Sequence, residues 1–215
     1  MSPVLAGTGR VADDLWLLAH DDVTGRAFVQ PRPLGLGLAA GLLAELVLTG
    51  SLSLAGEQFR VTAGRWPPAD DLAARVLGLV AGEREQHPVR DWLAYLARTA
   101  PEDVAARLAA CGYLARAGGW VPWRGGRWVP ADRDSAFAPL LRARAVLDAG
   151  RPLTAEGVVL AGLGEACGLG FRLAAYAPKP ARPLDAAVAL LDLGLRDLIA
   201  CTKAAVSSAV LAHRA

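Results

Sequence analysis

LGLGLAAGLLAELVL, residues 34–48, is the stretch that decides the fold, because it has the length of a helix and almost no polar face. Its single charged residue is Glu45. A helix that is apolar nearly all round must be buried, so we expect this segment to be the central helix of the domain. Gly35, Gly37 and Gly41 would let neighbouring helices approach it closely.

A short β-hairpin follows this helix directly, and the same helix-to-hairpin unit recurs later in the chain. The first unit covers residues 42–64 and reads LLAELVLTGSLSLAGEQFRVTAG, with alternating Leu52 and Leu54 expected to face Phe59 and Val61. The second covers residues 104–130 and reads VAARLAACGYLARAGGWVPWRGGRWVP. Such units can bind DNA, but they can equally be scaffold for a membrane or partner surface.

The second hairpin is rich in tryptophan and arginine. If Gly125 and Gly126 form a two-residue turn, Arg124 faces Arg127 and Trp123 faces Trp128 across the strands. Tryptophan prefers the headgroup level of a bilayer, so this hairpin is expected to contact a membrane or another subunit. The residues assigned to that contact are Trp120, Trp123, Arg124, Arg127 and Trp128. The competing interpretation is that the tryptophans pack into the core.

Charge is concentrated around the same hairpin. Residues 116–151 hold seven arginines and three aspartates, a local balance of +4, whereas the whole chain carries +2. Anionic lipid attracts such a face by about 1 kcal/mol per basic residue. A net charge of only +2 is weak for a dedicated nucleic-acid binder, so a nucleic-acid partner is not expected.

The remaining elements predict one mainly helical domain with no polar linker. Further helices are expected over residues 71–80, 91–97, 99–112, 137–149, 154–173 and 184–213, and a hairpin or loop over residues 15–29. Thr99 and Glu102 have the spacing of a capping box at the start of the third of these helices.

Composition and cysteine use indicate a globular cytoplasmic protein. Hydrophobic residues make up 53% of the 215 residues, and the longest apolar run, residues 33–44, is shorter than a membrane span needs. Residues 1–14 show no basic region followed by an apolar core and a cleavage site, so secretion is not expected. Cys111, Cys167 and Cys201 are too widely spaced for a metal or redox motif and are expected to be small buried residues in a reducing compartment.

The sequence does not indicate an enzyme, a metal site or a cofactor. The cluster His20-Asp21-Asp22 could in principle bind a metal ion, but we expect instead a turn whose aspartate side chain accepts backbone N–H groups. Gly35-Leu36-Gly37 lacks the third glycine and the preceding strand of a dinucleotide site.

LWLLAHDDVTGRAFVQPRPLGLGLAAGLLAELVLTGSLSL, residues 15–54, resembles the opening of the Golgi phosphoprotein 3 family, in particular its bacterial, actinobacterial-type members. The turn at residues 112–114 with its hairpin, the helix start at residues 136–139 and the C-terminal helix follow in the family's order. The resemblance implies a flexible segment over residues 1–14 and one helical domain over residues 15–215, built around a central apolar helix, with short β-hairpins of which one projects.

The resemblance also implies a function. In eukaryotic members the fold is a peripheral membrane adaptor that recognises phosphatidylinositol 4-phosphate and holds the tails of glycosyltransferases. This chain is accordingly expected at the inner face of the membrane, with anionic lipid, other copies of itself and client membrane-protein tails as partners.

The family's headgroup pocket uses a tryptophan and several arginines, and this chain keeps few of them. Alignment without gaps places Gln30 at the tryptophan and Ala39 at the first arginine, while Arg98 matches a later arginine and Pro101 falls at another. Arg98, together with Arg32 close to Gln30, forms the headgroup site that the resemblance implies. The family's membrane or self-association hairpin corresponds by position to residues 120–129.

Two alternatives from other functional classes remain open. A winged-helix DNA-binding protein needs exposed polar side chains on the helix before the wing, and Arg107 alone offers one there. A purely structural protein would use the second hairpin to dock onto another subunit.

Overall fold

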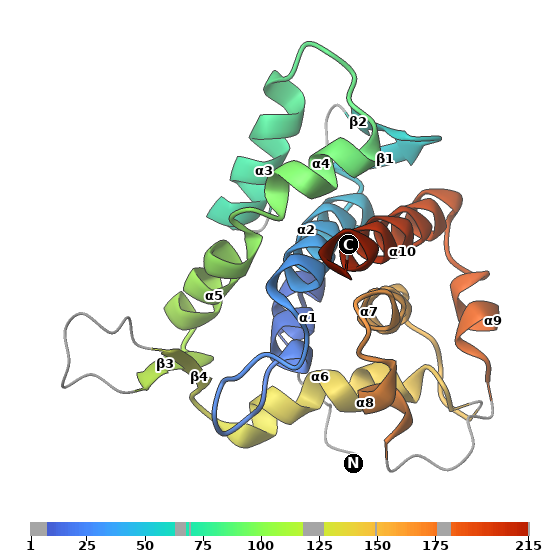
Figure 1. The fold of residues 1–215 in the computed structure, drawn as a ribbon. Helices are drawn as coiled ribbons and strands as arrows, with labels where there is room; N and C mark the ends of the chain where they lie inside the picture. Colours follow the sequence, from blue (N-terminus) through green and yellow to red (C-terminus); the bar gives the residue numbers. More distant parts are fainter. Residues whose placement is uncertain are drawn as a thin grey trace.

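Helix α2 (Pro31–Leu48) forms the centre of the protein in the computed structural model shown in Figure 1. The structure describes residues 8–62, 68, 70–117, 127–148, 150–175 and 182–214. Helices α1 (Val11–Ala19), α7 (Ala155–Ala166) and α10 (Leu193–Arg214) pack against α2, and α1 and α10 each also pack against α7. The buried apolar residues form one cluster that extends from Val11 to Ala209, so the described residues share a single core.

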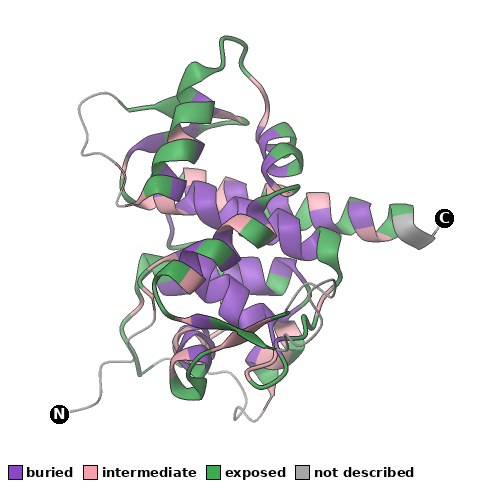
Figure 2. Ribbon diagram, turned by 90° about the vertical axis from the view of Figure 1, so that its left-hand side faces the viewer, coloured by how far each residue is buried: buried purple, intermediate pink, exposed green. Residues whose placement is uncertain are grey.

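The predicted central helix is confirmed, and it begins three residues earlier than expected, with prolines in its first turn. By length and hydropathy alone α2 would pass as a membrane span, but 72% of it is buried inside the protein. Figure 2 shows this buried helix at the middle of the molecule, with exposed residues on the surrounding elements. The close approach of neighbours is also confirmed, because a Cβ atom at Gly41 would lie 2.9 Å from the Ala12 backbone.

The other helices cover the core from two ends (Figure 1). One end carries α3 (Asp71–Gly82), α4 (Val89–Leu96) and the hairpin of β1 (Leu52–Ala55) and β2 (Gln58–Val61). The opposite end carries α6 (Arg133–Ala145) and α8 (Gly170–Ala174). Helix α5 (Ala100–Ala110) leads to β3 (Leu114–Ala117) and β4 (Arg127–Pro130), and α9 (Leu184–Val188) lies on the other flank.

The first hairpin has the predicted register. Leu52 pairs with Val61 and Leu54 with Phe59, as their alternation indicates. Leu54 and Phe59 are buried and fasten the hairpin to the core.

The second hairpin exists, and its described strands pair Trp128 with Arg116 and Arg127 with Ala117. The predicted pairing across a Gly125-Gly126 turn involves residues outside the described part of the chain. The observed pairing buries Leu114 and joins the Tyr113 carbonyl to the Ala131 N–H, so contacts at the base of the hairpin decide the register. Trp120, Trp123 and Arg124 lie outside the described residues.

Several helix boundaries differ from the predictions. Residues 15–19 belong to α1, which begins at Val11, inside the segment expected to be flexible. The helix predicted over residues 154–173 breaks after α7, where Gly168 adopts a φ of +89°, a conformation that costs glycine nothing. The helix predicted over residues 184–213 is divided into α9 and α10.

Two further expectations are wrong. Thr99 precedes α5 but makes no capping hydrogen bond with its side chain, because its backbone already has helical angles. Cys111 is exposed at the end of α5, whereas Cys167 is buried and Cys201 half-buried.

Candidate functional site

The two arginines assigned to a headgroup site lie on turns that pack against each other. Arg32 is exposed in the first turn of α2, and Arg98 is exposed just after the last turn of α4. Gly35 lies directly against the end of α4, since a Cβ atom there would be 2.5 Å from the Ala97 carbonyl oxygen. Arg32 lies three residues before Gly35, on the same face of α2. Arg98 directly follows Ala97, so both arginines lie close to this contact. The fold therefore brings the two arginine-bearing turns together.

Arg98 lines a cavity of about 460 Å³ between α3, the end of α4 and α5. Leu42, Val76 and Leu96 form its buried floor. At the rim, Arg75 is neutralised by Asp103 at 2.6 Å. Arg98, in contrast, makes no ion pair with any residue that the structure describes. An unpaired guanidinium beside a cavity is suited to a phosphate or carboxylate ligand.

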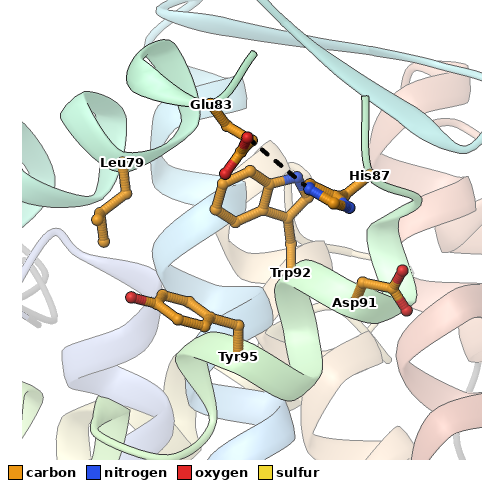
Figure 3. Close-up of a pocket in the computed structure, with 6 residues that line it drawn as sticks. All are labelled: Leu79, Glu83, His87, Asp91, Trp92 and Tyr95. Atoms are coloured by element: carbon orange, nitrogen blue, oxygen red, sulfur yellow. Dashed lines mark ion pairs between the residues drawn. The ribbon is translucent and has the colours of Figure 1, made fainter. Parts of the chain in front are cut away.

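A second cavity of about 310 Å³ continues this one along the groove between α3 and α4. Figure 3 shows its lining, with Leu79 and Tyr95, which also line the first cavity. The indole of Trp92 contacts the rings of His87 and Tyr95 edge to face. Glu83 and Asp91 give this end an acidic rim, and His87 lies 4.0 Å from Glu83.

The other positions of the family's headgroup pocket do not gather around Arg98. Ala39 is completely buried, so its side chain faces the core. Gln30 is an exposed residue that precedes α2. Pro101 lines a different cavity of about 260 Å³, under the second hairpin. Among the described residues that line this cavity, Arg98 is thus the arginine without an ion pair, and Arg32 lies on the adjoining turn.

The described part of the second hairpin is attached to the body of the protein. Trp128 is half-buried against the core, and the Arg116 guanidinium lies 4.2 Å from the centre of its ring. Arg127 is exposed and donates from Nη1 to the Thr24 carbonyl oxygen at 3.4 Å. Trp128 is thus half-buried against the core, while Arg127 stays at the surface; the other tryptophans of the hairpin lie outside the described residues.

A buried ion network, which sequence reasoning missed, joins the N-terminal segment to the core. Arg107 donates to Asp13 at 2.8 Å and to Glu45 at 3.0 Å, and it lies 3.4 Å from Asp70. Arg10 adds a second cation at 3.3 Å from Asp70. The one sequence signal was the single carboxylate, Glu45, on an otherwise apolar helix, since a buried charge needs a partner.

The network keeps Arg107 charged and inaccessible. Burial lowers the pKa of its guanidinium, but the carboxylates of Glu45 and Asp13 raise that pKa above its usual value. Burial raises the pKa of the Asp13 and Glu45 carboxyl groups, and Arg107 opposes the shift. With 8% of its surface exposed, Arg107 is not a side chain that could reach a DNA base, so its assignment as an exposed residue is wrong.

The His20-Asp21-Asp22 cluster is a turn, as predicted. Asp21 Oδ1 accepts the N–H groups of Val23 and Thr24 at 3.2 and 2.7 Å. His20 stacks on Trp16, and burial lowers the pKa of its imidazole from 6.5 to about 4. Among the residues described, no three His, Cys, Asp or Glu side chains are grouped to hold a metal ion.

Comparison with known proteins assigns this architecture to a family. The family model of Golgi phosphoprotein 3 (GPP34) matches residues 11–189. No protein with a curated description matches the chain. The matched region begins with the first residue of α1 and ends one residue after α9, so it contains both arginines, the second hairpin and, except for Arg10, the ion network.

Proposed function

Because the chain belongs to the Golgi phosphoprotein 3 family, we propose that it is a non-enzymatic peripheral membrane protein that binds anionic phospholipid. The observation that carries this proposal is Arg98, an exposed guanidinium without an ion pair to any described residue, at the mouth of a cavity of about 460 Å³. A lipid phosphate would accept its hydrogen bonds, and Arg32 on the adjoining turn would add a second positive charge. By resemblance the headgroup is that of phosphatidylinositol 4-phosphate.

Binding to vesicles tests this proposal. We expect the protein to sediment with vesicles that contain phosphatidylinositol 4-phosphate and to leave them at high salt, because the contact is electrostatic. Phosphatidylserine vesicles of matched charge test the headgroup, and weaker binding to them is expected. Equal binding would contradict recognition of that headgroup, and absence of binding to both would contradict lipid binding altogether.

Charge reversal at the site gives the residue-level test. Arg98→Glu should weaken binding at least tenfold, since a basic residue near an anionic surface contributes about 1 kcal/mol and the variant also adds repulsion. Arg90→Glu is the matched control, because Arg90 is an arginine on α4 whose side chain is 75% exposed. Equal losses in the two variants would locate the contact elsewhere.

As an adaptor, the protein would also hold tails of membrane proteins, and the groove between α3 and α4 suits them chemically. Its floor exposes Leu79 and Tyr95, and Glu83 and Asp91 make its rim acidic. Cytoplasmic segments next to membrane spans are rich in lysine and arginine, which complements that rim. We therefore place the protein at the inner face of the membrane.

A basic tail peptide tests this groove. The peptide should bind the wild type and should not bind a variant with both Glu83→Lys and Asp91→Lys. Equal binding to both proteins would exclude the groove.

Self-association is the remaining expectation for partners. The second hairpin would make the contact, and light scattering at increasing concentration measures it. We expect a mass above that of the 22.4 kDa chain that falls in Trp128→Ala. A mass of one chain at all concentrations would contradict the expectation.

A further inference from the structure

Two phenylalanine rings contact each other at the surface. One belongs to the loop that joins α1 to α2, and the other belongs to α8. Phe28, in this loop, is 38% exposed, and Phe171, in α8, is 56% exposed. Their ring centroids are 6.3 Å apart at 78°. Val23 in the same loop is 53% exposed. Exposed apolar side chains that gather in one place indicate a contact surface.

Two arginines lie beside these rings, and neither forms an ion pair with a residue that the structure describes. The Arg172 guanidinium lies 4.1 Å from the centre of the Phe28 ring. It makes no hydrogen bond to any residue in the described part of the chain, and its Nε is buried without a partner. Arg144 Nη2 donates to the Arg172 carbonyl oxygen at 2.9 Å, which brings a second guanidinium to the same place.

The acidic groups that face Arg172 are Asp22 and Asp21. Burial lowers the pKa of the Arg172 guanidinium, and the charges of these two aspartates oppose that shift. Asp21 Oδ1 already accepts two backbone N–H groups and the Thr24 hydroxyl of its own turn. Arg26 is exposed in the same loop, and exposed Arg127 donates to the Thr24 carbonyl oxygen of this loop. Exposed arginine side chains therefore lie on the elements that carry the two rings or contact them.

This surface continues into the second hairpin. Arg127 of β4 donates to the Thr24 carbonyl oxygen at 3.4 Å, and Gly25 lies directly against the backbone of Trp128. Figure 1 shows the loop beside β4, with α8 next to α6. The hairpin, the loop and α8 thus form one continuous face.

We propose that Val23, Arg26, Phe28, Phe171 and Arg172, which we call the loop–α8 surface, enter the headgroup layer of an anionic bilayer. The inference rests on the proposed membrane function and adds a contact surface distinct from the cavity at Arg98. Phe28 and Phe171 lie at the boundary of the acyl chains, and Arg172 and Arg26 bind lipid phosphates. A bilayer fits better than a protein partner, because it supplies an apolar layer and a layer of phosphates side by side.

Vesicles of phosphatidylcholine with 30% phosphatidylserine test the proposal. Phe171→Ala should weaken binding of the full chain about tenfold, from the loss of one inserted aromatic side chain. Phe171→Trp should restore it, because tryptophan prefers the interface. Leu211→Ala is the matched control, since Leu211 is 68% exposed at the far end of α10 and should not contribute.

The outcomes separate this inference from the proposed function. If the wild type binds and Phe171→Ala binds equally well, the loop–α8 surface is excluded while lipid binding stands. If Leu211→Ala loses as much as Phe171→Ala, the effect is not specific to this surface and the inference fails. If the wild type binds no anionic vesicle, the proposed function fails as well. Unfolding temperatures of the variants confirm that each is folded, which the exposure of Phe171 leads us to expect.

Discussion

Replacing Arg107 by methionine removes the cation that neutralises the buried carboxylates. The Arg107 side chain is 6% exposed and that of Asp13 is 1% exposed, and the two groups lie 2.7 Å apart. Glu45, at 3.0 Å, loses the same partner. Breaking a buried ion pair from one side costs about 3–5 kcal/mol, because a charge stays buried without compensation. Methionine keeps most of the side-chain volume, so we expect a loss of about this size at pH 7.

The pH dependence of the loss identifies its cause. Without the guanidinium, burial raises the pKa of Asp13 and Glu45 further above the values in the unfolded chain. A carboxyl group whose pKa is higher in the folded than in the unfolded state stabilises the folded state most below its unfolded pKa, where it is protonated in both states. This contribution to the free energy of unfolding is lost as pH rises through the folded pKa. The difference between wild type and Arg107→Met should therefore shrink from pH 7 to pH 4.

Urea unfolding followed by circular dichroism measures both effects. The control is Arg75→Met, which breaks the pair with Asp103, whose side chains are 55% and 24% exposed. A surface pair contributes at most about 1 kcal/mol, so this variant should be close to wild type. A loss in Arg107→Met no larger than in the control, or one that is the same at pH 7 and pH 4, would refute the reasoning.

Three further predictions concern His20, the glycines and the cysteines. Burial lowers the pKa of His20 from 6.5 to about 4, so the wild type should lose about 3 kcal/mol of unfolding free energy as pH falls through that interval. His20→Gln should remove this loss. An acid unfolding transition that is the same in both proteins would contradict the prediction. Gly35→Ala should cost about 1–3 kcal/mol in thermal or urea unfolding, because its Cβ atom would lie 2.5 Å from a backbone oxygen. Gly78→Ala, whose Cβ atom meets open space on α3, should instead stabilise by about 0.5–1 kcal/mol. Cys111 should react rapidly with a thiol reagent, whereas Cys167 should react only in denaturant, because burial raises the pKa of its thiol to about 12; rapid labelling of both would show that α7 opens.

The sequence predicted correctly those elements whose structure depends on the residues of that segment alone. The apolar run at residues 34–48 required a buried helix, and the alternation from Leu52 to Val61 set the register of the first hairpin. The aspartate at residue 21 was recognised as a turn residue from its neighbours alone.

Predictions were missing or wrong where distant contacts outweighed a local preference. The Gly125-Gly126 pair lies outside the described residues, and the pairing of β4 with residues 114–117, where Leu114 is buried and Arg116 stacks on Trp128, was not predicted. Residues 189–192, between α9 and α10, contain no proline or glycine that would end a helix, whereas Gly194 in the first turn of α10 packs against the backbone of Leu54 in β1.

The candidate site, too, was predicted in part from the sequence, while the rest depends on tertiary contacts. Arg98 and Arg32 were found by resemblance, but the packing of Gly35 on Ala97 that joins their turns spans 62 residues of sequence. Phe28 and Phe171 carry no local signal, because each is a lone aromatic residue until the fold places them together.

The sequence by itself determined which helix is central and that the domain is mainly helical, because burial of an apolar segment follows from its own composition. Only the tertiary structure decided which charges are buried and which reach the surface. Arg107 and Arg98 are both arginines near the ends of short helices, yet the first lies among three carboxylates and the second beside a cavity. Whether a charge is neutralised depends on residues up to 94 positions away, and that distance is closed only when the chain packs around α2.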